Sequence, residues 1–217
     1  MSRDVPVKVI AGWIANGITP IARLVDCAFA VTGPAPVLPI GQALVVELGG
    51  EPVIVAEEAR PLYHAALAHG ANHLVVLVAQ AAQALAAAGV AAPDRVLGPL
   101  LAAALDGAVR SAAAAAGGTT TGSAGVAALT GPVVRADVAT VTAHLTELAR
   151  LAGRDESAAD IPASYRALAR SAVTRSLAGR RIRPDQAAQL LDALAEPAHG
   201  GASGPPEQSS DQGGGPR

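Results

Sequence analysis

Aromatic side chains are nearly absent from this sequence of 217 residues, and the four that occur are Trp13, Phe29, Tyr63 and Tyr165. The formal net charge is -2, from 16 Lys and Arg against 18 Asp and Glu. Nucleic-acid binding needs a surplus of cationic groups for the phosphates, and single strands also need aromatic faces on which bases stack. A nucleic-acid partner is therefore not expected.

Cysteine is almost as scarce. Cys27 is the single cysteine, which excludes an internal disulfide framework and a cysteine-rich zinc site. The first residues hold no apolar run of signal-peptide length. Together these absences favour a cytoplasmic protein.

Several short motifs that are typical of nucleotide-binding proteins and hydrolases are missing. The sequence holds no G-x-G-x-x-G, no G-x-x-x-x-G-K-[ST], no G-x-S-x-G and no H-E-x-x-H. It therefore encodes neither a glycine-rich cradle for a dinucleotide pyrophosphate nor the nucleophile turn of a hydrolase.

Alanine is what the sequence has in excess. Hydrophobic residues make up 51% and nearly half of these are alanine, which favours closely packed helices. The longest apolar stretch, residues 74–92, is interrupted by Gln80 and Gln83. Alanine inserts poorly into bilayers, so we interpret this stretch as a buried helix and expect no membrane partner.

The front of the chain predicts a small βαβ unit. An apolar strand at residues 27–32, a helix at 39–48 and a second strand at 52–56 follow one another within about 30 residues, a length typical of such a unit. The two strands should lie parallel. Residues 1–19 show no clear period and are interpreted as a poorly determined leader.

The rest of the chain predicts helices only. Periodicity, prolines at first turns and glycines at ends predict five helices, at residues 61–89, 94–116, 137–151, 161–178 and 184–196. Residues 117–125 read as a flexible Gly/Thr/Ser loop and residues 197–217 as a disordered tail. The predicted fold class is mainly α, with a small βαβ unit in front.

One face of the long helix presents His64 and Asn72. An imidazole exchanges protons near neutral pH and an amide can hold a carbonyl oxygen, so the two suit reversible reduction at a C=O group. The alternative is a hydrogen-bonded structural histidine and an asparagine bonded to a loop, and periodicity alone favours this alternative.

Two further histidines on the same helix, His69 and His73, have the i, i+4 spacing that can chelate a metal. No third ligand in a recognisable pattern accompanies them. We therefore predict no metal site and interpret both as partner-facing or capping residues.

A second polar group surrounds residues 129–137. Asp137 suits a helix N-cap and Pro132 a turn, while Thr130 and Arg135 have no such explanation. An arginine beside a helix N-terminus could receive a carboxylate or phosphate. The structural and the ligand-binding interpretations stay open.

These segments resemble the Rossmann-like proteins that carry the C-terminal domain of unknown function 2520. The resemblance rests on F-A-V-T at residues 29–32, G-G-E-P at 49–52, E-E-A-R-P-L-Y-H from residue 57, and L-T-G-P-V-V-R-A-D at 129–137. Such proteins are similar to ketopantoate reductase, pyrroline-carboxylate reductase and 6-phosphogluconate dehydrogenase.

The resemblance implies an NAD(P)-dependent oxidoreductase whose N-terminal cofactor segment is truncated. It implies His64 and Asn72 as catalytic residues, and substrate contacts at the following positions: Tyr63, Thr130, Arg135 and Asp137. Related reductases use a lysine as proton donor on the long helix. Lys8 is the single lysine here, so His64 would substitute.

The resemblance also implies a domain organisation. Residues 20–58 would be the remnant of a Rossmann-like NAD(P)-binding domain, and residues 59–196 the helical domain, for which a homodimer and a small acidic substrate are expected. The chain alone is expected to be inactive. The alternative is a non-catalytic helical module for dimerisation or docking.

Overall fold

The computed structural model describes residues 8–11, 27–116 and 126–195. The leader apart from residues 8–11, the predicted loop 117–125 and the predicted tail 197–217 lie outside these ranges. The chain divides into two compact units, residues 1–89 and 90–217, and each is considered by itself. The domain boundary at residue 58 stays a prediction.

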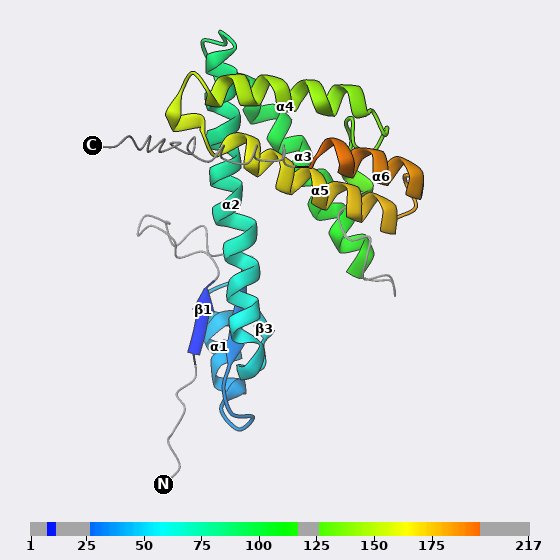
Figure 1. The fold of residues 1–217 in the computed structure, drawn as a ribbon. Helices are drawn as coiled ribbons and strands as arrows, with labels where there is room; N and C mark the ends of the chain where they lie inside the picture. The colour runs from blue at the N-terminus through cyan, green and yellow to red at the C-terminus, as the bar shows by residue number, and fades with distance from the viewer. Residues whose placement is uncertain (1–7, 12–26, 117–125, 196–217) are drawn as a thin grey trace, which may run out of the picture. The chain divides into compact units, whose positions relative to one another are not determined.

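The first unit contains the predicted βαβ arrangement (Figure 1). Strand β2 (Ala28–Thr32) leads into helix α1 (Leu38–Glu47) and strand β3 (Glu51–Ile54). β2 and β3 are parallel, with Ala30 opposite Val53, so the prediction of parallel strands is confirmed. Phe29, Val31 and Val45 form the small core of this unit.

An additional strand pairs with the opposite edge of β2. Strand β1 (Lys8–Ala11) runs antiparallel to it, with Val9 opposite Val31, and gives the sheet order β1-β2-β3. This strand lies in the segment interpreted as an irregular leader. Its four residues are too few for a period to be recognised in the sequence.

Helix α2 (Arg60–Ala87) follows β3 through a single turn of 3-10 helix, η2 (Glu57–Ala59). Its 28 residues confirm the long helix, but the prediction that residues 74–92 are buried is wrong. Gln80 is the one buried residue of α2, and Val75 is 69% exposed. The hydrophobic residues lie all round the helix; of its Leu and Val residues, Leu67, Val78 and Leu85 are half-buried and the others are exposed.

The second unit contains the remaining helices, α3 (Pro93–Ala116), α4 (Val138–Ala152), α5 (Ile161–Ala178) and α6 (Pro184–Ala193). Short 3-10 turns, η3 (Val126–Ala128) and η4 (Glu156–Ala158), precede α4 and α5. The predicted helices are confirmed. The mainly α fold class with its small βαβ unit is confirmed as well.

The main core lies among α4, α5 and α6, whose contacts are visible in Figure 1. Val141, Val173, Leu190 and Leu194 are fully buried there. Val141 and Leu145 lie four residues apart on α4, as do Ala169 and Val173 on α5, so one stripe of each helix faces the core.

Helices α2 and α3 are each long and apolar enough to span a bilayer by length and composition, although only 6% of the most apolar window of each is buried. Leu97 is the single buried residue of α3. Asp106 and Arg110 form an ion pair of 2.6 Å within α3, and charged groups are costly in hydrocarbon. The absence of a membrane partner stays a prediction.

Candidate functional site

The carboxyl ends of the two parallel strands mark the first candidate site. β2 ends at Thr32 and β3 at Ile54, and both ends lie at one edge of the sheet because the strands are parallel. In open α/β sheets, ligands bind outside this edge. The segment that follows β3, from Glu57 into the first turns of α2, is therefore the part of the first unit where a ligand site is expected.

A cavity of about 410 Å³ lies in that segment. Its lining residues are Glu57, Arg60, Pro61, Tyr63 and His64. Tyr63 and His64 were predicted site residues, and the structure brings them together. Glu57 and Arg60 were missed because they look like ordinary charged residues at a helix start, although they belong to the same run of sequence as Tyr63 and His64.

Glu57 ties the end of the strand to the start of the helix. The buried Thr32 hydroxyl donates to Glu57 Oε2 at 3.2 Å, and Arg60 Nη1 donates to Glu57 Oε1 at 2.5 Å. Arg60 is the first residue of α2, so one carboxylate contacts the last residue of β2 and the first residue of this helix. This network fixes one wall of the cavity.

Arg60 keeps part of its hydrogen-bonding capacity unused. Its Nη1 is taken by Glu57, while its Nε is buried and has no hydrogen-bond partner among the described residues. A buried donor without an acceptor costs free energy. A guanidinium binds carboxylates and phosphates by donating paired N–H groups, and the Arg60 side chain is 28% exposed, so the part of it that reaches the surface could bind an anionic group.

His64 and Tyr63 supply the other functional groups of the cavity. His64 is exposed and has no hydrogen bond within the described chain, while Tyr63 is half-buried. Asn72 follows His64 by eight positions on α2, which is about 12 Å along the axis at 1.5 Å per residue. It does not line the cavity, so the structure does not bring Asn72 to the same point as His64.

The second predicted group, which lies at the start of α4, belongs to the other unit. Asp137 is the N-cap: its Oδ1 accepts from the Thr140 amide at 3.0 Å and its Oδ2 from the Thr140 hydroxyl at 2.6 Å. These bonds, aided by the charges of Arg135 and His144, hold the pKa of the Asp137 carboxyl below its ordinary value. The capping interpretation of Asp137 is confirmed.

Thr130 and Arg135 remain exposed on the preceding turn. Gly131 has a φ of +94° and Ala136 a φ of +54°, so this turn needs two left-handed residues, and alanine adopts that conformation reluctantly. The backbone N–H of Arg135 donates to the Gly131 carbonyl at 3.4 Å, but no described hydrogen bond involves the side chain of either Thr130 or Arg135. Their ligand-binding interpretation stays a prediction.

His144 is fixed by an aromatic partner. Its Nδ1 lies 2.9 Å from the Tyr165 hydroxyl, and the two rings meet edge to face with centroids 5.8 Å apart. Partial burial raises the pKa of the Tyr165 hydroxyl. The pair joins α4 to α5 and accounts for His144 structurally.

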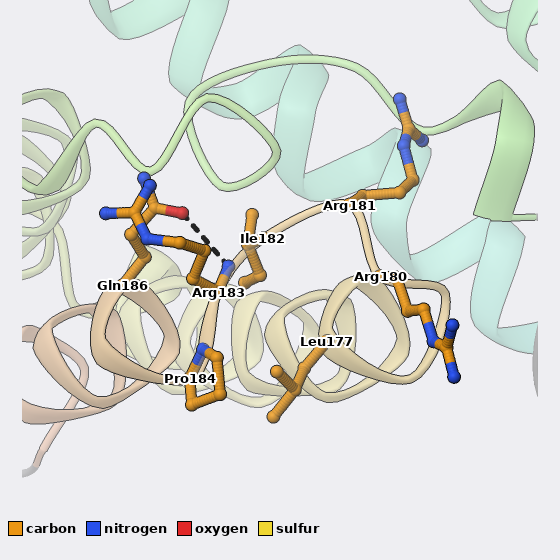
Figure 2. Close-up of a pocket in the computed structure, with 7 residues that line it drawn as sticks. All are labelled: Leu177, Arg180, Arg181, Ile182, Arg183, Pro184 and Gln186. Atoms are coloured by element: carbon orange, nitrogen blue, oxygen red, sulfur yellow. Dashed lines mark hydrogen bonds between the residues drawn. The ribbon is translucent and has the colours of Figure 1, made fainter.

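A cavity of about 500 Å³ at the turn between α5 and α6 is lined by three arginines, two of which have partners within the described chain (Figure 2). The side chains of Arg180, Arg181 and Arg183 point in different directions. Arg181 donates to the carbonyl oxygens of Val126 and Leu129, and Arg183 forms a bidentate pair with Asp185 at 3.0 Å. These contacts join the turn to its neighbours.

The described residues do not fit the phosphates of a nicotinamide cofactor. The connection from β2 to α1 is where a Rossmann sheet would offer backbone amides, yet Pro34 and Pro36 within it, and Pro39 in the first turn of α1, lack N–H donors. The N-cap of α1, Val37, has no side-chain acceptor or donor. No group of three metal-ligating side chains occurs in the described ranges either.

Comparison with known proteins links the chain to one family. The model of the domain of unknown function DUF2520 matches residues 27–172. A search of curated proteins gives no match. The crystal structure of protein TM1727 from Thermotoga maritima is similar at 21% identity and a TM-score of 0.49, over 70% of this chain and 56% of that one. The chain thus spans little more than half the length of that structure. Because the family model covers more than half of the sequence, the chain belongs to the DUF2520 family.

Proposed function

We propose that the chain is the substrate-binding and dimerisation portion of an NAD(P)-dependent oxidoreductase that resembles ketopantoate reductase. The observation that carries this proposal is the cavity at the carboxyl edge of β2 and β3, where a histidine, a tyrosine and an arginine line one space. Ligands of open α/β sheets bind at this edge. A carbonyl reduction needs a proton donor, and His64 is the group in the cavity that exchanges protons near neutral pH.

In this proposal the substrate is a small acid. The exposed part of the Arg60 guanidinium would bind its carboxylate, and His64 would give a proton to the oxygen of the carbonyl being reduced. Asn72, which the family resemblance implies as a site residue, does not line the cavity. Arg135, which the resemblance also implies, belongs to the second unit, and its role stays a separate prediction. The cofactor phosphates would be held by residues other than those described here.

A calorimetric titration with NADPH tests the cofactor part of the proposal. We expect no saturable binding to the 217-residue chain, and binding once a strand and a G-x-G-x-x-G turn encoded upstream precede it. Tight binding by the short chain alone, or no binding by the extended one, would contradict the proposal.

Two substitutions in the extended protein test the assigned roles. His64→Gln should lower turnover by about 10²–10⁴-fold, the usual contribution of a general acid, while NADPH binding stays unchanged. Arg60→Lys keeps the charge but removes the planar fork, so KM for the acid should rise more than kcat falls. His144→Gln, a histidine outside the cavity, is the matched control and should leave both constants near wild type.

The second candidate function is a non-catalytic dimerisation module, and the exposure of α2 favours it. Leu62, Val75 and Val76 are 75%, 69% and 49% exposed, and large contiguous apolar surfaces on soluble proteins mark interaction sites. Alanine and Gly70 between them allow two helices to approach closely. Histidines and Asn72 in mid-helix favour a second copy of the chain over a lipid environment.

Light scattering distinguishes the alternatives. A dimeric wild type that dissociates in Val75→Glu would support pairing through α2, while Thr142→Glu, an exposed change on α4, should leave the dimer intact. A monomeric wild type would exclude the dimerisation role. Partition of the wild type into phosphatidylcholine vesicles would instead support a membrane-associated helix.

A further inference from the structure

His69 and His73 form a close pair on α2 that the proposed function does not use. Their Nδ1 atoms lie 2.9 Å apart, and their rings meet edge to face with centroids 4.9 Å apart. Both side chains are exposed. Without a metal, one nitrogen donates its hydrogen to the other, so a single proton lies between two nitrogen lone pairs.

The distance between the nitrogens matches the bite of a transition-metal ion. Metal–nitrogen bonds to histidine are about 2.0–2.1 Å long, so two of them at a right angle separate the nitrogens by about 2.8–3.0 Å. A tetrahedral angle would separate them by about 3.3–3.4 Å. The observed 2.9 Å fits the right angle, which is typical of square-planar or octahedral Cu(II) and Ni(II).

The surroundings of the pair leave room for such an ion. One turn earlier on the helix stand Ala65 and Ala66, and a Cβ placed on Gly70 would meet no atom within 4 Å. Water could therefore fill the coordination positions that the protein leaves open. No third histidine, cysteine or carboxylate joins the pair in the part of the chain that the structure covers, so the protein supplies two ligands.

The charges along α2 do not oppose a cation at this place. The helix contains no Asp or Glu that would hold the histidines in ion pairs, and its one arginine, Arg60, is nine positions before His69, about 13 Å along the axis. No charged group of α2 therefore competes with a metal ion for the two imidazole nitrogens.

We propose that His69 and His73 form a two-histidine site for a divalent transition-metal ion of the Cu(II) or Ni(II) type, which binds both Nδ1 atoms and joins consecutive turns of α2. The imidazole whose Nδ1 carries the hydrogen moves it to its own Nε2 through solvent, so that each ring gives the ion one lone pair and no proton is lost. The site is independent of the cavity at the sheet edge. It revises the prediction from the sequence, which rejected a metal for lack of a third ligand.

Titration of the full chain with CuCl₂ and with NiCl₂, followed by calorimetry, tests the proposal. We expect one equivalent of either ion to bind to the wild type, and at least a ten-fold loss of affinity in His69→Gln and in His73→Gln. His64→Gln, a change of another histidine on the same helix, should bind as the wild type does. Equal affinity of His73→Gln and the wild type would overturn the proposal.

A second variant separates the pair from the mere number of histidines. The double substitution His73→Leu with Leu74→His keeps the composition but turns the second imidazole by about 100° around the helix. It should lose affinity as His73→Gln does, and wild-type affinity in this variant would overturn the proposal.

Electron paramagnetic resonance of the Cu(II) complex provides a readout of the ligands themselves. The wild-type spectrum should show hyperfine coupling to two equivalent nitrogens, and the His73→Gln spectrum to one. Coupling to a single nitrogen in the wild type would contradict the two-histidine site even if copper bound tightly. Circular dichroism of each variant confirms that the helix is retained.

Discussion

Helices α2 and α6 show how differently two parts of this chain use hydrophobic residues. α6 has ten residues, and both Leu190, within it, and Leu194, which caps it, are fully buried against α4 and α5. α2 has 28 residues, among them many Leu, Val and Ala, and buries only Gln80. Hydrophobic content therefore does not measure burial here; what matters is whether the apolar residues form one stripe that faces a partner.

The difference predicts where the chain is stabilised. Helices α4, α5 and α6 bury their apolar residues against one another, so this core should stay folded without a partner. The apolar surface of α2 is left largely exposed. Substitutions at buried and at exposed positions test this difference, because they should change the free energy of unfolding by different amounts.

The largest effect is expected in α6. Leu190→Ala should destabilise the second unit by about 2–5 kcal/mol, because it removes buried methyl groups and leaves a cavity. The neighbouring Leu191 is 39% exposed, and Leu191→Ala should cost at most about 0.5 kcal/mol. Urea unfolding followed by circular dichroism measures both. Equal losses would show that the α4–α6 core is not packed as described.

A smaller effect is expected in the first unit. An added Cβ on Gly50 would lie 2.5 Å from two ring carbons of Phe29, whose side chain is buried, so Gly50→Ala should cost about 1–3 kcal/mol through overpacking. In contrast, Gly70→Ala places its methyl group in open space within α2 and should stabilise by about 0.5–1 kcal/mol. Opposite signs in thermal unfolding would confirm the contrast between a packed and an uncovered glycine. A loss in both variants would indicate that α2 is covered near Gly70.

The smallest effect concerns pH and the cap of α4. The pKa of Asp137 is lowered in the folded state, so its contribution to stability is present above the ordinary carboxyl pKa of 3.8 and is lost as the pH falls through the lower folded value. Asp137→Asn keeps a capping side chain without the charge. The variant should be less stable than the wild type at pH 7, and the gap should close below pH 3.8.

Urea midpoints at several pH values measure this gap, with Asp94→Asn in the first turn of α3 as the control. A constant gap between pH 7 and pH 3 would show that the charge of Asp137 does not contribute to the cap.

Much of the fold was predictable from the sequence because prolines and glycines mark where its helices begin and end. Pro162 and Gly179 bracket α5, and the helix runs from Ile161 to Ala178 as predicted. The short strand β1 was not predictable, because its pairing with β2 depends on residues more than fifteen positions away rather than on a local period. The exposure of α2 was equally hidden, since composition does not say what covers a helix.

The candidate site was predictable in part. Tyr63 and His64 were recognised from a family pattern, and the structure places both in one cavity. The contribution of Arg60 depends on which of its nitrogens Glu57 occupies, and that is a matter of three-dimensional geometry. Helical periodicity puts Asn72 on the same side of α2 as His64, but it does not show that two turns of helix separate the two residues by about 12 Å along the axis.

The carboxylate of Glu57 makes the candidate cavity mechanically sensitive to the sheet. The carboxylate accepts from Thr32 with one oxygen and from Arg60 with the other. A shift at the end of β2 would therefore also displace the Arg60 guanidinium. An anion that drew Arg60 toward itself would move Glu57 and so change the hydrogen bond that Glu57 accepts from the Thr32 hydroxyl. The same two hydrogen bonds would therefore couple the binding of a ligand in the cavity to the position of the end of β2.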